Sequence, residues 1–448
     1  MAIGLINNTI LKPYSSSPSS SDDIQSLDIS SNNDVLVPLT IFDKAAFDLH
    51  VAVLYAFKAP MPSNEVMKAA LSKVLVYYPH LAGRFTTDGQ GRTCIVLNNA
   101  GIRVTETYVP TSLAELLPFD PSKDVRHLLP PVEGNIEELL QIQLNRYACG
   151  GLVIGQTAHH RVCDGQSMSS FFVAWARTVR GLATDPLPYH DRLAVSQPRN
   201  PPKVDFDHRS IEFKKSTMNP DMAPVFSPSI ETLIIHYSPE FVKKLKSKIS
   251  EQSSAQNQRY STFECLLSHT WKKVTEARGL DLEESTQVRV AVNGRARIKP
   301  SVPMEYFGNL VLWAYPKLKV KELLEHNHAY IAKAIHDEVT RVDNNYFKSF
   351  IDFGEIAKAD GGEELEATAP EFGNSLCPDL EVDSWLRFQF HDLDFGGGGP
   401  CAFFPPNIPV EGLVIFLPTC SEDGGVDAVL SLLPEHVPLF KQISHSID

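Results

Sequence analysis

The chain has 448 residues, a formal net charge of −13, 43% hydrophobic residues and 21% charged residues. This balance excludes a disordered chain or a fibre, and no apolar run approaches the roughly 18 residues that cross a bilayer. The acidic charge disfavours a nucleic-acid partner, because binding phosphates needs a basic surplus. At about 150 residues per domain, the length favours two or three domains.

The seven cysteines are scattered and are never spaced as CxxC. This pattern is typical of reduced cytosolic thiols and favours neither a disulfide framework nor a zinc site. The first residues carry neither a basic segment nor a long apolar one, so no signal peptide is predicted. We therefore expect a soluble cytoplasmic protein with no metal site and no membrane partner.

Hydrophobic periodicity predicts alternating elements in the first half of the chain. The pattern indicates strands over 45–57 and 152–155, a helix that follows Ser63 and is stopped by Pro79, and helices over 136–144 and 166–180. Residues 185–222 are rich in proline and show little periodicity, so we interpret them as a crossover linker.

The second half of the chain also alternates between predicted helices and strands. It predicts helices over 239–249, 262–277, 321–342 and 435–443 and strands over 287–292, 382–390 and 410–417. Alternation in both halves predicts an α/β architecture. We place an N-terminal domain at 1–184 and a C-terminal domain at 223–448, on either side of the linker.

The segment most informative about chemistry is QTAHHRVCDG, residues 156–165. A strand ends at two histidines, and an Asp-Gly turn leads into a helix. His160 can present a ring nitrogen to a cleft as a general base, while Asp164 pins the loop and Gly165 lets the chain turn without steric cost. A buried structural histidine beside a helix-capping aspartate would give the same pattern. A metal site is disfavoured, because His159 and His160 point to opposite faces without a third ligand nearby.

A second unusual segment is DFGGGGP, residues 394–400. Its glycines allow a close backbone approach or an anion-binding turn, and a flexible hairpin fits equally well. A kinase is excluded because the other kinase motifs are missing, and no GxSxG elbow indicates a serine hydrolase.

HHRVCDG and DFGGG together resemble the plant BAHD acyl-CoA-dependent acyltransferases, whose motifs are HxxxDG and DFGWG. Further landmarks of that family appear in order as VPLTIFDKA (37–45), YYPHLAGRF (77–85), STFECLLSHTWK (261–272) and VNGRARIKP (292–300). Within the family, three segments are similar to those of the amine N-hydroxycinnamoyltransferases, such as the agmatine coumaroyltransferases. These segments are DFGGG, YFKSFIDF (346–353) and EVDSWLR (381–387). Gly397 stands where most relatives carry tryptophan.

The resemblance implies two chloramphenicol-acetyltransferase-like α/β domains with a central solvent channel and a segment near 375–405 that crosses to the N-terminal domain. It implies that His160 is the catalytic base and that Asp164 pairs with Arg295 or Arg297. Cys163 is expected to be a passive core residue. The residues implied to be structural in the second motif are Asp394, Phe395, Gly396 and Gly398.

The implied co-substrate is acyl-CoA, with no cofactor, and its phosphates need a local basic patch on this acidic protein. Lys244 and Lys248 lie on a lysine-rich predicted helix, although a solvated helix face would carry the same residues. Weaker candidates for CoA contacts are Ser261, Thr262 and Asn293.

The acceptor is predicted from acidic residues. Asp383 and Trp385 share one face of a predicted strand, and a carboxylate there suits a cationic amine. Glu371 is a further candidate, and the lack of arginine between Arg341 and Arg387 argues against shikimate. We therefore expect transfer of a p-coumaroyl or feruloyl group to agmatine or a similar primary amine, giving a phenolamide of plant specialised metabolism.

Two alternatives remain open at this point. The first is an O-hydroxycinnamoyltransferase that acts on a shikimate-type or alcohol acceptor. The second is a non-catalytic binding protein on the same scaffold. A monomer is expected by analogy with relatives.

Overall fold

The computed structural model describes residues 3–15, 35–121, 123–131, 134–215, 229–253, 258–359, 365–368, 374–405, 410–420 and 424–447. The chain forms two compact units. Unit 1 comprises Met1–Gln197, Val302–Leu310 and Phe388–Pro406, and unit 2 comprises Pro198–Ser301, Val311–Arg387 and Asn407–Asp448. The division after Gln197 falls inside the predicted 185–222 linker. The domain limits at 184 and 223 stay predictions.

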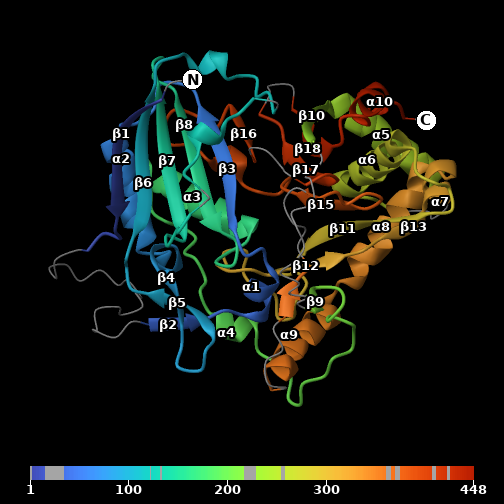
Figure 1. Cartoon of the computed structure of the whole chain (residues 1–448), viewed down its shortest axis with the longest axis horizontal. Coiled ribbons are helices and arrows are strands. Elements are labelled where there is room, and N and C mark those ends of the chain that lie inside the picture. The colour runs from blue at the N-terminus through green and yellow to red at the C-terminus, as the bar shows by residue number, and fades with distance from the viewer. Residues whose placement is uncertain are drawn as a thin grey trace. The chain divides into compact units, whose positions relative to one another are not determined.

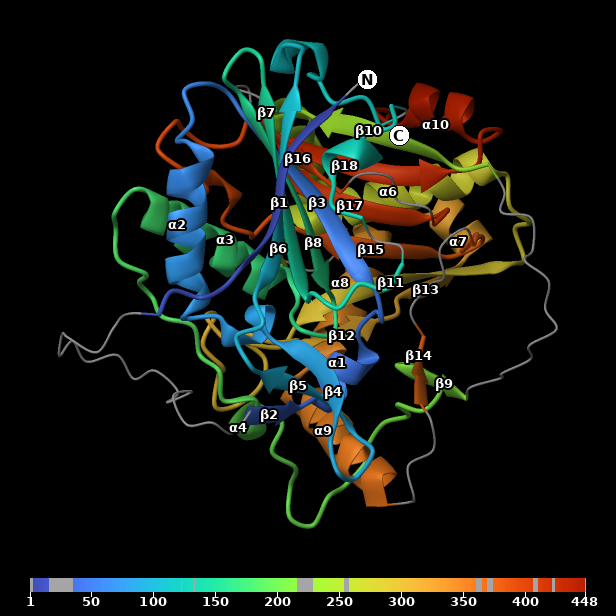
Figure 2. The same cartoon turned by 60° about the vertical axis from the view of Figure 1, so that its left-hand side comes forward.

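Unit 1 is organised around a six-stranded sheet in the order β1-β6-β7-β8-β3-β16. The strands are β1 (Gly4–Leu11), β3 (His50–Phe57), β6 (Ile102–Val109), β7 (Leu140–Tyr147), β8 (Leu152–His159) and β16 (Ala402–Phe404). Helices α2 (Asn64–Leu75) and α3 (Gly165–Val179) lie next to each other on one side of this sheet (Figure 2). The buried indole of Trp175 on α3 donates to the carbonyl of Met67 on α2 at 3.0 Å, which ties the two helices together.

The rest of unit 1 comprises a small sheet and several short helices. A small sheet has the order β2-β5-β4. Its strands and the remaining helices are β2 (Val35–Pro38), β4 (Arg84–Thr87), β5 (Thr93–Leu97), α1 (Ile41–Ala45), α4 (Arg192–Val195), η1 (Pro79–Ala82), η2 (Leu113–Glu115), η3 (Arg126–Leu128) and η4 (Phe390–Asp392).

Unit 2 contains a second sheet in the order β10-β18-β17-β15-β11-β12, with β13 also paired to β11. Helices α5, α6 and α8 lie together on one side of it (Figure 1). The strands are β10 (Glu231–Tyr237), β11 (Ser285–Asn293), β12 (Val311–Ala314), β13 (Lys317–Lys319), β15 (Leu380–Ser384), β17 (Leu413–Pro418) and β18 (Val426–Leu432), with β9 (Phe213–Lys215) and β14 (Leu365–Ala367) as a separate pair. The helices are α5 (Pro239–Gln252), α6 (Thr262–Arg278), α7 (Val320–Glu325), α8 (His328–Arg341), α9 (Asn344–Ala359) and α10 (Val437–Ile443).

The predicted helix over 136–144 is wrong, because this segment enters β7. Apolar Leu140, Ile142 and Leu144 alternate there with polar residues, which is the period of a strand. The polar side chains are also buried and bond one another, since Gln143 Nε2 donates to Asn145 Oδ1 at 2.8 Å. Buried amides made the alternation harder to recognise.

Other predicted elements need new limits. The helix expected over 321–342 divides into α7 and α8, because the Asn327 side chain accepts from the Tyr330 N–H and starts a new helix. The strand expected over 382–390 ends at Ser384, and the one expected over 45–57 begins only at His50, after α1. In the part of the chain that the structure describes, no helix is long and apolar enough to cross a membrane.

Candidate active site

His160 occupies the turn between β8 and α3 in unit 1. Its backbone N–H donates to the carbonyl of Leu49 at 2.9 Å, and its carbonyl accepts from Asn309 Nδ2 at 2.9 Å. The imidazole is half-buried, with its ring centroid 5.6 Å from that of Phe47. The backbone is thus held on both sides of His160, and the ring atom Nδ1 is buried.

The neighbouring His159 has a different environment. Its ring lies 4.7 Å from the ring of Phe85 and 5.0 Å from that of His50, both measured between centroids. Burial is the main cause that lowers the pKa of His159 to about 3, and interactions with His50 and Arg161 add to it. His159 is therefore neutral at physiological pH and serves as a packing residue.

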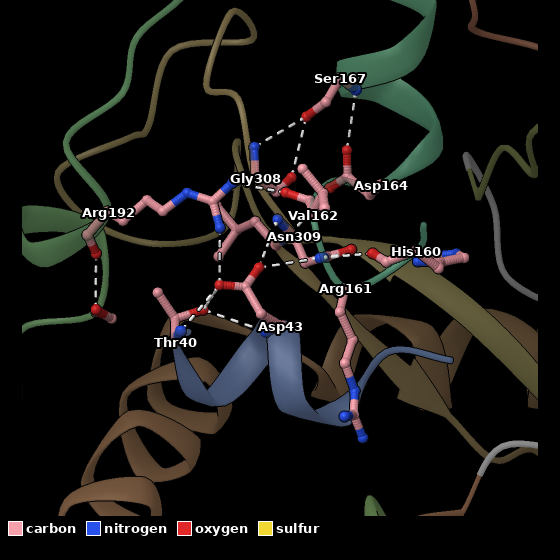
Figure 3. A network of polar contacts seen from close by, with 12 residues as sticks. Thr40, Asp43, His160, Arg161, Val162, Asp164, Ser167, Arg192, Gly308 and Asn309 are labelled. Atoms are coloured by element: carbon pink, nitrogen blue, oxygen red, sulfur yellow. Dashed lines mark hydrogen bonds and ion pairs between the residues drawn. The ribbon is translucent and has the colours of Figure 1, made fainter. Parts of the chain in front are cut away.

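Asp164 caps α3. Its Oδ1 accepts from the Ser167 N–H at 3.0 Å (Figure 3). Its Oδ2 accepts from the Leu310 N–H at 3.1 Å. The residue is buried, so the carboxylate orders two backbone segments of unit 1. The structure therefore places Asp164 in a supporting position for the loop that carries His160.

Gly165 is the first residue of α3, and its backbone does not need the left-handed conformation. The reason for glycine is a close approach: a Cβ at this position would lie 2.7 Å from Cζ of Phe388. The sequence-based explanation of a turn without steric cost is therefore replaced by a packing contact.

Sequence reasoning missed three side chains that surround the same loop: Asp43, Arg192 and Asn309. Asp43 and Arg192 form a buried ion pair of 2.9 Å, and the Asn309 amide bonds both Asp43 and the His160 carbonyl. The Thr40–Asp43 spacing is a capping box, and this signal could have identified the start of α1. Nothing in the sequence alone connects these residues to His160.

The DFGGG segment is an internally bonded turn of unit 1. Asp394 Oδ1 accepts from the backbone N–H groups of Gly396 and Gly398 at 2.7 and 2.9 Å, and both glycines have positive φ. Phe395 is fully buried, 5.0 Å from the ring of Trp175. A Cβ on Gly397 would lie 2.1 Å from the carbonyl oxygen of Pro60, so this backbone does not accept a larger residue there.

The two candidate arginines lie in unit 2 and have different surroundings. Arg297 Nη1 donates to the carbonyls of Val339 and Val342 at 2.7 and 3.0 Å, at the end of α8. Arg295 is fully buried, and its N–H donates to Asn293 Oδ1 at 3.0 Å. The predicted ion pair of Asp164 with Arg295 or Arg297 stays a prediction.

The lysine-rich helix is α5, which borders a surface groove of about 580 Å³. The groove is lined by Lys243 and Lys246, together with Pro239, Val242, Ser247, Ser250, Gly425 and Val426. Neither predicted lysine lines it: Lys244 is exposed elsewhere on the helix, and Lys248 Nζ donates to the carbonyl of Ile447.

The other candidates for CoA contacts are unequally placed. Ser261 caps α6, with its hydroxyl accepting from Glu264 N–H at 3.2 Å and donating to the Glu264 carboxylate at 2.7 Å, so it is engaged in the fold. Thr262 lies next to the groove lysines, because its hydroxyl accepts from Lys246 Nζ at 3.4 Å. Asn293 Oδ1 binds Arg295, as described above.

The acceptor candidates lie on and after β15. Glu381 pairs with Arg289 at 2.8 Å, and that guanidinium lies 3.9 Å from the ring centroid of Trp313. Burial, with the negative charge of Glu381 as the second cause, raises the pKa of Asp383 to about 7, although Arg289 opposes the shift. Trp385 is half-buried directly after the strand.

Glu371 lies outside the described residues, so its role as an acceptor contact stays a prediction. Among the described residues, no group of three or more histidine, cysteine or acidic side chains could hold a metal ion. Cys163 is buried in unit 1, as the prediction of a core residue requires.

Comparisons with known proteins bear on the family of this chain. A model of the Transferase family matches residues 26–446. Tryptamine hydroxycinnamoyltransferase 2 of Oryza sativa subsp. japonica is 51% identical over 415 residues, covering 92% of this chain and 93% of the relative. Agmatine coumaroyltransferase-1 of Hordeum vulgare is 42% identical over 416 residues, covering 92% of this chain and 94% of the relative.

The fold also has a counterpart among solved structures. TRI101 of F. sporotrichioides, in complex with coenzyme A and T-2, matches with a TM-score of 0.75 at 18% identity, covering 91% of this chain and 96% of that chain. The likeness confirms the predicted α/β fold of the chloramphenicol acetyltransferase type.

Proposed function

Because the chain belongs to the Transferase family of BAHD acyltransferases, we propose that it transfers a hydroxycinnamoyl group from CoA to a primary amine. Its class is that of the acyl-CoA-dependent N-acyltransferases. The observation that carries the proposal is the His160 turn, in which the backbone is fixed on both sides and the residue is only half-buried.

The chemistry needs a single base. The neutral amine nitrogen attacks the thioester carbonyl, and His160 accepts the proton that the nitrogen loses. The tetrahedral intermediate then collapses, the carbon–sulfur bond breaks, and the CoA thiolate takes the proton from His160. The amide and free CoA are the products, and no acyl-enzyme is formed. Because an alkylamine must lose a proton before it attacks, we expect an activity optimum above neutral pH.

Agmatine is the acceptor that the charges on β15 favour. Arg289 neutralises Glu381, so Asp383 is the carboxylate of this strand left to bind a cation. The guanidinium of agmatine stays charged and can bind a carboxylate through two hydrogen bonds while the primary amine reacts.

Tryptamine is a second candidate, because the 51% identical relative is named for that acceptor. Tryptamine has one amine and no second cation, so its binding depends on aromatic contacts. Removal of the Asp383 charge should therefore weaken agmatine binding and spare tryptamine.

The proposal is tested with purified protein, p-coumaroyl-CoA and an equimolar pool of agmatine, tryptamine, putrescine, tyramine and shikimate. Mass spectrometry should detect an amide of one or two amines, with His160→Ala as the matched control. A shikimate ester as the main product would replace N-acylation by the O-acyltransferase alternative. No product from any donor and acceptor would support a non-catalytic binding protein.

We also propose a cytoplasmic monomer that uses acyl-CoA as a co-substrate without a bound cofactor. Light scattering should give a mass near the 49.7 kDa of one chain, and a mass twice as large would contradict the monomer.

A further inference from the structure

Two backbone carbonyls in the turn that carries His160 accept hydrogen bonds from side chains elsewhere in unit 1. The carbonyl of His160 accepts from Asn309 Nδ2 at 2.9 Å, and the carbonyl of Val162 accepts from Arg192 Nη2 at 2.6 Å. These residues come from distant parts of the sequence. The turn is therefore fixed by two donors, one on each side of Arg161.

Both donors are bound by one carboxylate (Figure 3). Asp43 Oδ1 accepts from Asn309 Nδ2 at 3.0 Å and from its backbone N–H at 3.3 Å. Asp43 Oδ2 accepts from Arg192 Nη1 at 2.9 Å and from the N–H and hydroxyl of Thr40, each at 2.8 Å. The Asn309 amide thus uses one hydrogen for Asp43 and the other for His160.

The network lies in the interior. Asp43 has 0% of its surface exposed, and Arg192 and Asn309 have 3% each. Burial opposes the charge of Arg192, yet the adjacent Asp43 raises the pKa of the guanidinium above its ordinary value, so Arg192 stays charged. Buried polar networks with satisfied partners hold their members in one arrangement.

We infer that Asp43 is a positioning residue for the transfer reaction, acting through Asn309 and Arg192 on the backbone of the His160 turn. This inference rests on the proposed function of His160 as the base. Its consequence is that loss of the link should reduce turnover more than it reduces substrate binding, because a catalytic group displaced by about 1 Å can lose about 100-fold in rate.

Asn309→Ala tests the inference most cleanly, since it removes the link to His160 and keeps the Asp43–Arg192 ion pair. Asp43→Asn is the second variant and removes the charge that orders both donors. Asn145→Ala is the matched control. Asn145 is also fully buried, and its Nδ2 donates to the carbonyls of Leu128 and Val153 at 2.8 and 3.0 Å, at the end of β8 opposite to His160.

We expect kcat of Asn309→Ala to fall about 10- to 100-fold, with KM for p-coumaroyl-CoA within about twofold of wild type. Asn145→Ala should lower the melting temperature about as much as Asn309→Ala does, but it should leave kcat unchanged. Equal kcat values for Asn309→Ala and wild type, measured well below both melting temperatures, would overturn the inference. Equal losses of kcat in Asn309→Ala and Asn145→Ala would overturn it as well, because they would show a general effect of stability.

A readout independent of activity separates this inference from the proposed function. Diethylpyrocarbonate modifies accessible imidazoles, and peptide mass spectrometry gives the rate at His160 alone. We expect at least a threefold change of that rate in Asn309→Ala and none in Asn145→Ala. If wild type forms no amide, the proposed function fails, and the modification rate still decides whether Asn309 positions His160: an unchanged rate would reject it.

Discussion

The turn after β8 and the strand β15 show two ways in which this molecule handles buried and half-buried carboxylates. Around the turn, Asp43 and Asp164 use both carboxylate oxygens to accept hydrogen bonds from unit 1. On β15, Glu381 is paired with Arg289, whereas the Asp383 side chain forms no hydrogen bond or ion pair among the described residues and its pKa is raised to about 7.

The difference indicates separate tasks. Carboxylates whose partners are all supplied by the fold are suited to hold a reactive group in place. A carboxyl group that titrates near neutrality can instead become ionised when a cationic ligand binds, because the nearby positive charge lowers the pKa of the carboxyl group. Under the proposed function, the first region carries the chemistry and the second the acceptor choice, and the following variants can break or sharpen that division.

The largest effect is expected from His160→Ala. Loss of the base should reduce kcat by about 10²- to 10⁴-fold without unfolding the protein. His159→Gln is the control from the adjacent position and should lower stability while costing less than about tenfold in kcat. Steady-state kinetics and circular dichroism measure both. An equal loss of kcat in the two variants would contradict the distinction between a reactive His160 and a packing His159.

Asp164→Asn should affect stability and turnover together. The new amide places a donor against the N–H of Leu310 or of Ser167, and an unsatisfied buried polar group costs about 1–3 kcal/mol. The free energy of unfolding measured in urea and the kcat should both fall. A stable Asp164→Asn enzyme with full activity would contradict the supporting role of this residue.

Gly397→Ala should destabilise unit 1 by about 1–3 kcal/mol, because its Cβ would overlap the Pro60 carbonyl. The matched control is Gly399→Ala, whose Cβ would lie 3.8 Å from the carbonyl oxygen of His391 and should cost little. Restoring the tryptophan of most relatives at Gly397 should be worse than alanine. Unchanged melting of Gly397→Trp would show that the position is permissive.

Asp383→Asn should raise KM for agmatine about tenfold, if its ion pair with the guanidinium contributes about 1.4 kcal/mol, and it should leave KM for acyl-CoA unchanged.

The effect of Asp383→Asn on stability depends on pH. Because the folded protein binds the Asp383 proton more tightly than the unfolded chain does, wild-type stability falls as pH rises from about 4 to about 7. The melting temperature of Asp383→Asn relative to wild type should therefore rise over that range, and a constant difference would contradict the shift.

The smallest effect is expected at the groove beside α5. Simultaneous Lys243→Ala and Lys246→Ala substitutions remove two cations that line it and should raise KM for acyl-CoA a few-fold, with KM for the amine unchanged. Simultaneous Lys244→Ala and Lys248→Ala substitutions are the matched control of equal charge. A larger effect of that control would place CoA phosphates on the originally predicted lysines.

The sequence allowed prediction of the features that depend on local order. The His160–Asp164–Gly165 turn combines a strand end, an N-cap and a helix start within ten residues, and these signals are local. Asp43 and Asn309 could not be found in this way, because their proximity to His160 is produced by tertiary packing. The same limit applies to Gly397, whose constraint is the carbonyl of Pro60 far away in the chain.

Direct transfer without an acyl-enzyme is the central claim, and the initial-velocity pattern tests it most directly. Rates of amide formation are measured while p-coumaroyl-CoA and the amine are varied against each other. Our account predicts intersecting double-reciprocal lines, because both substrates are bound when His160 removes the proton. Parallel lines together with a p-coumaroylated protein in the intact mass spectrum would contradict it, because they indicate a covalent intermediate.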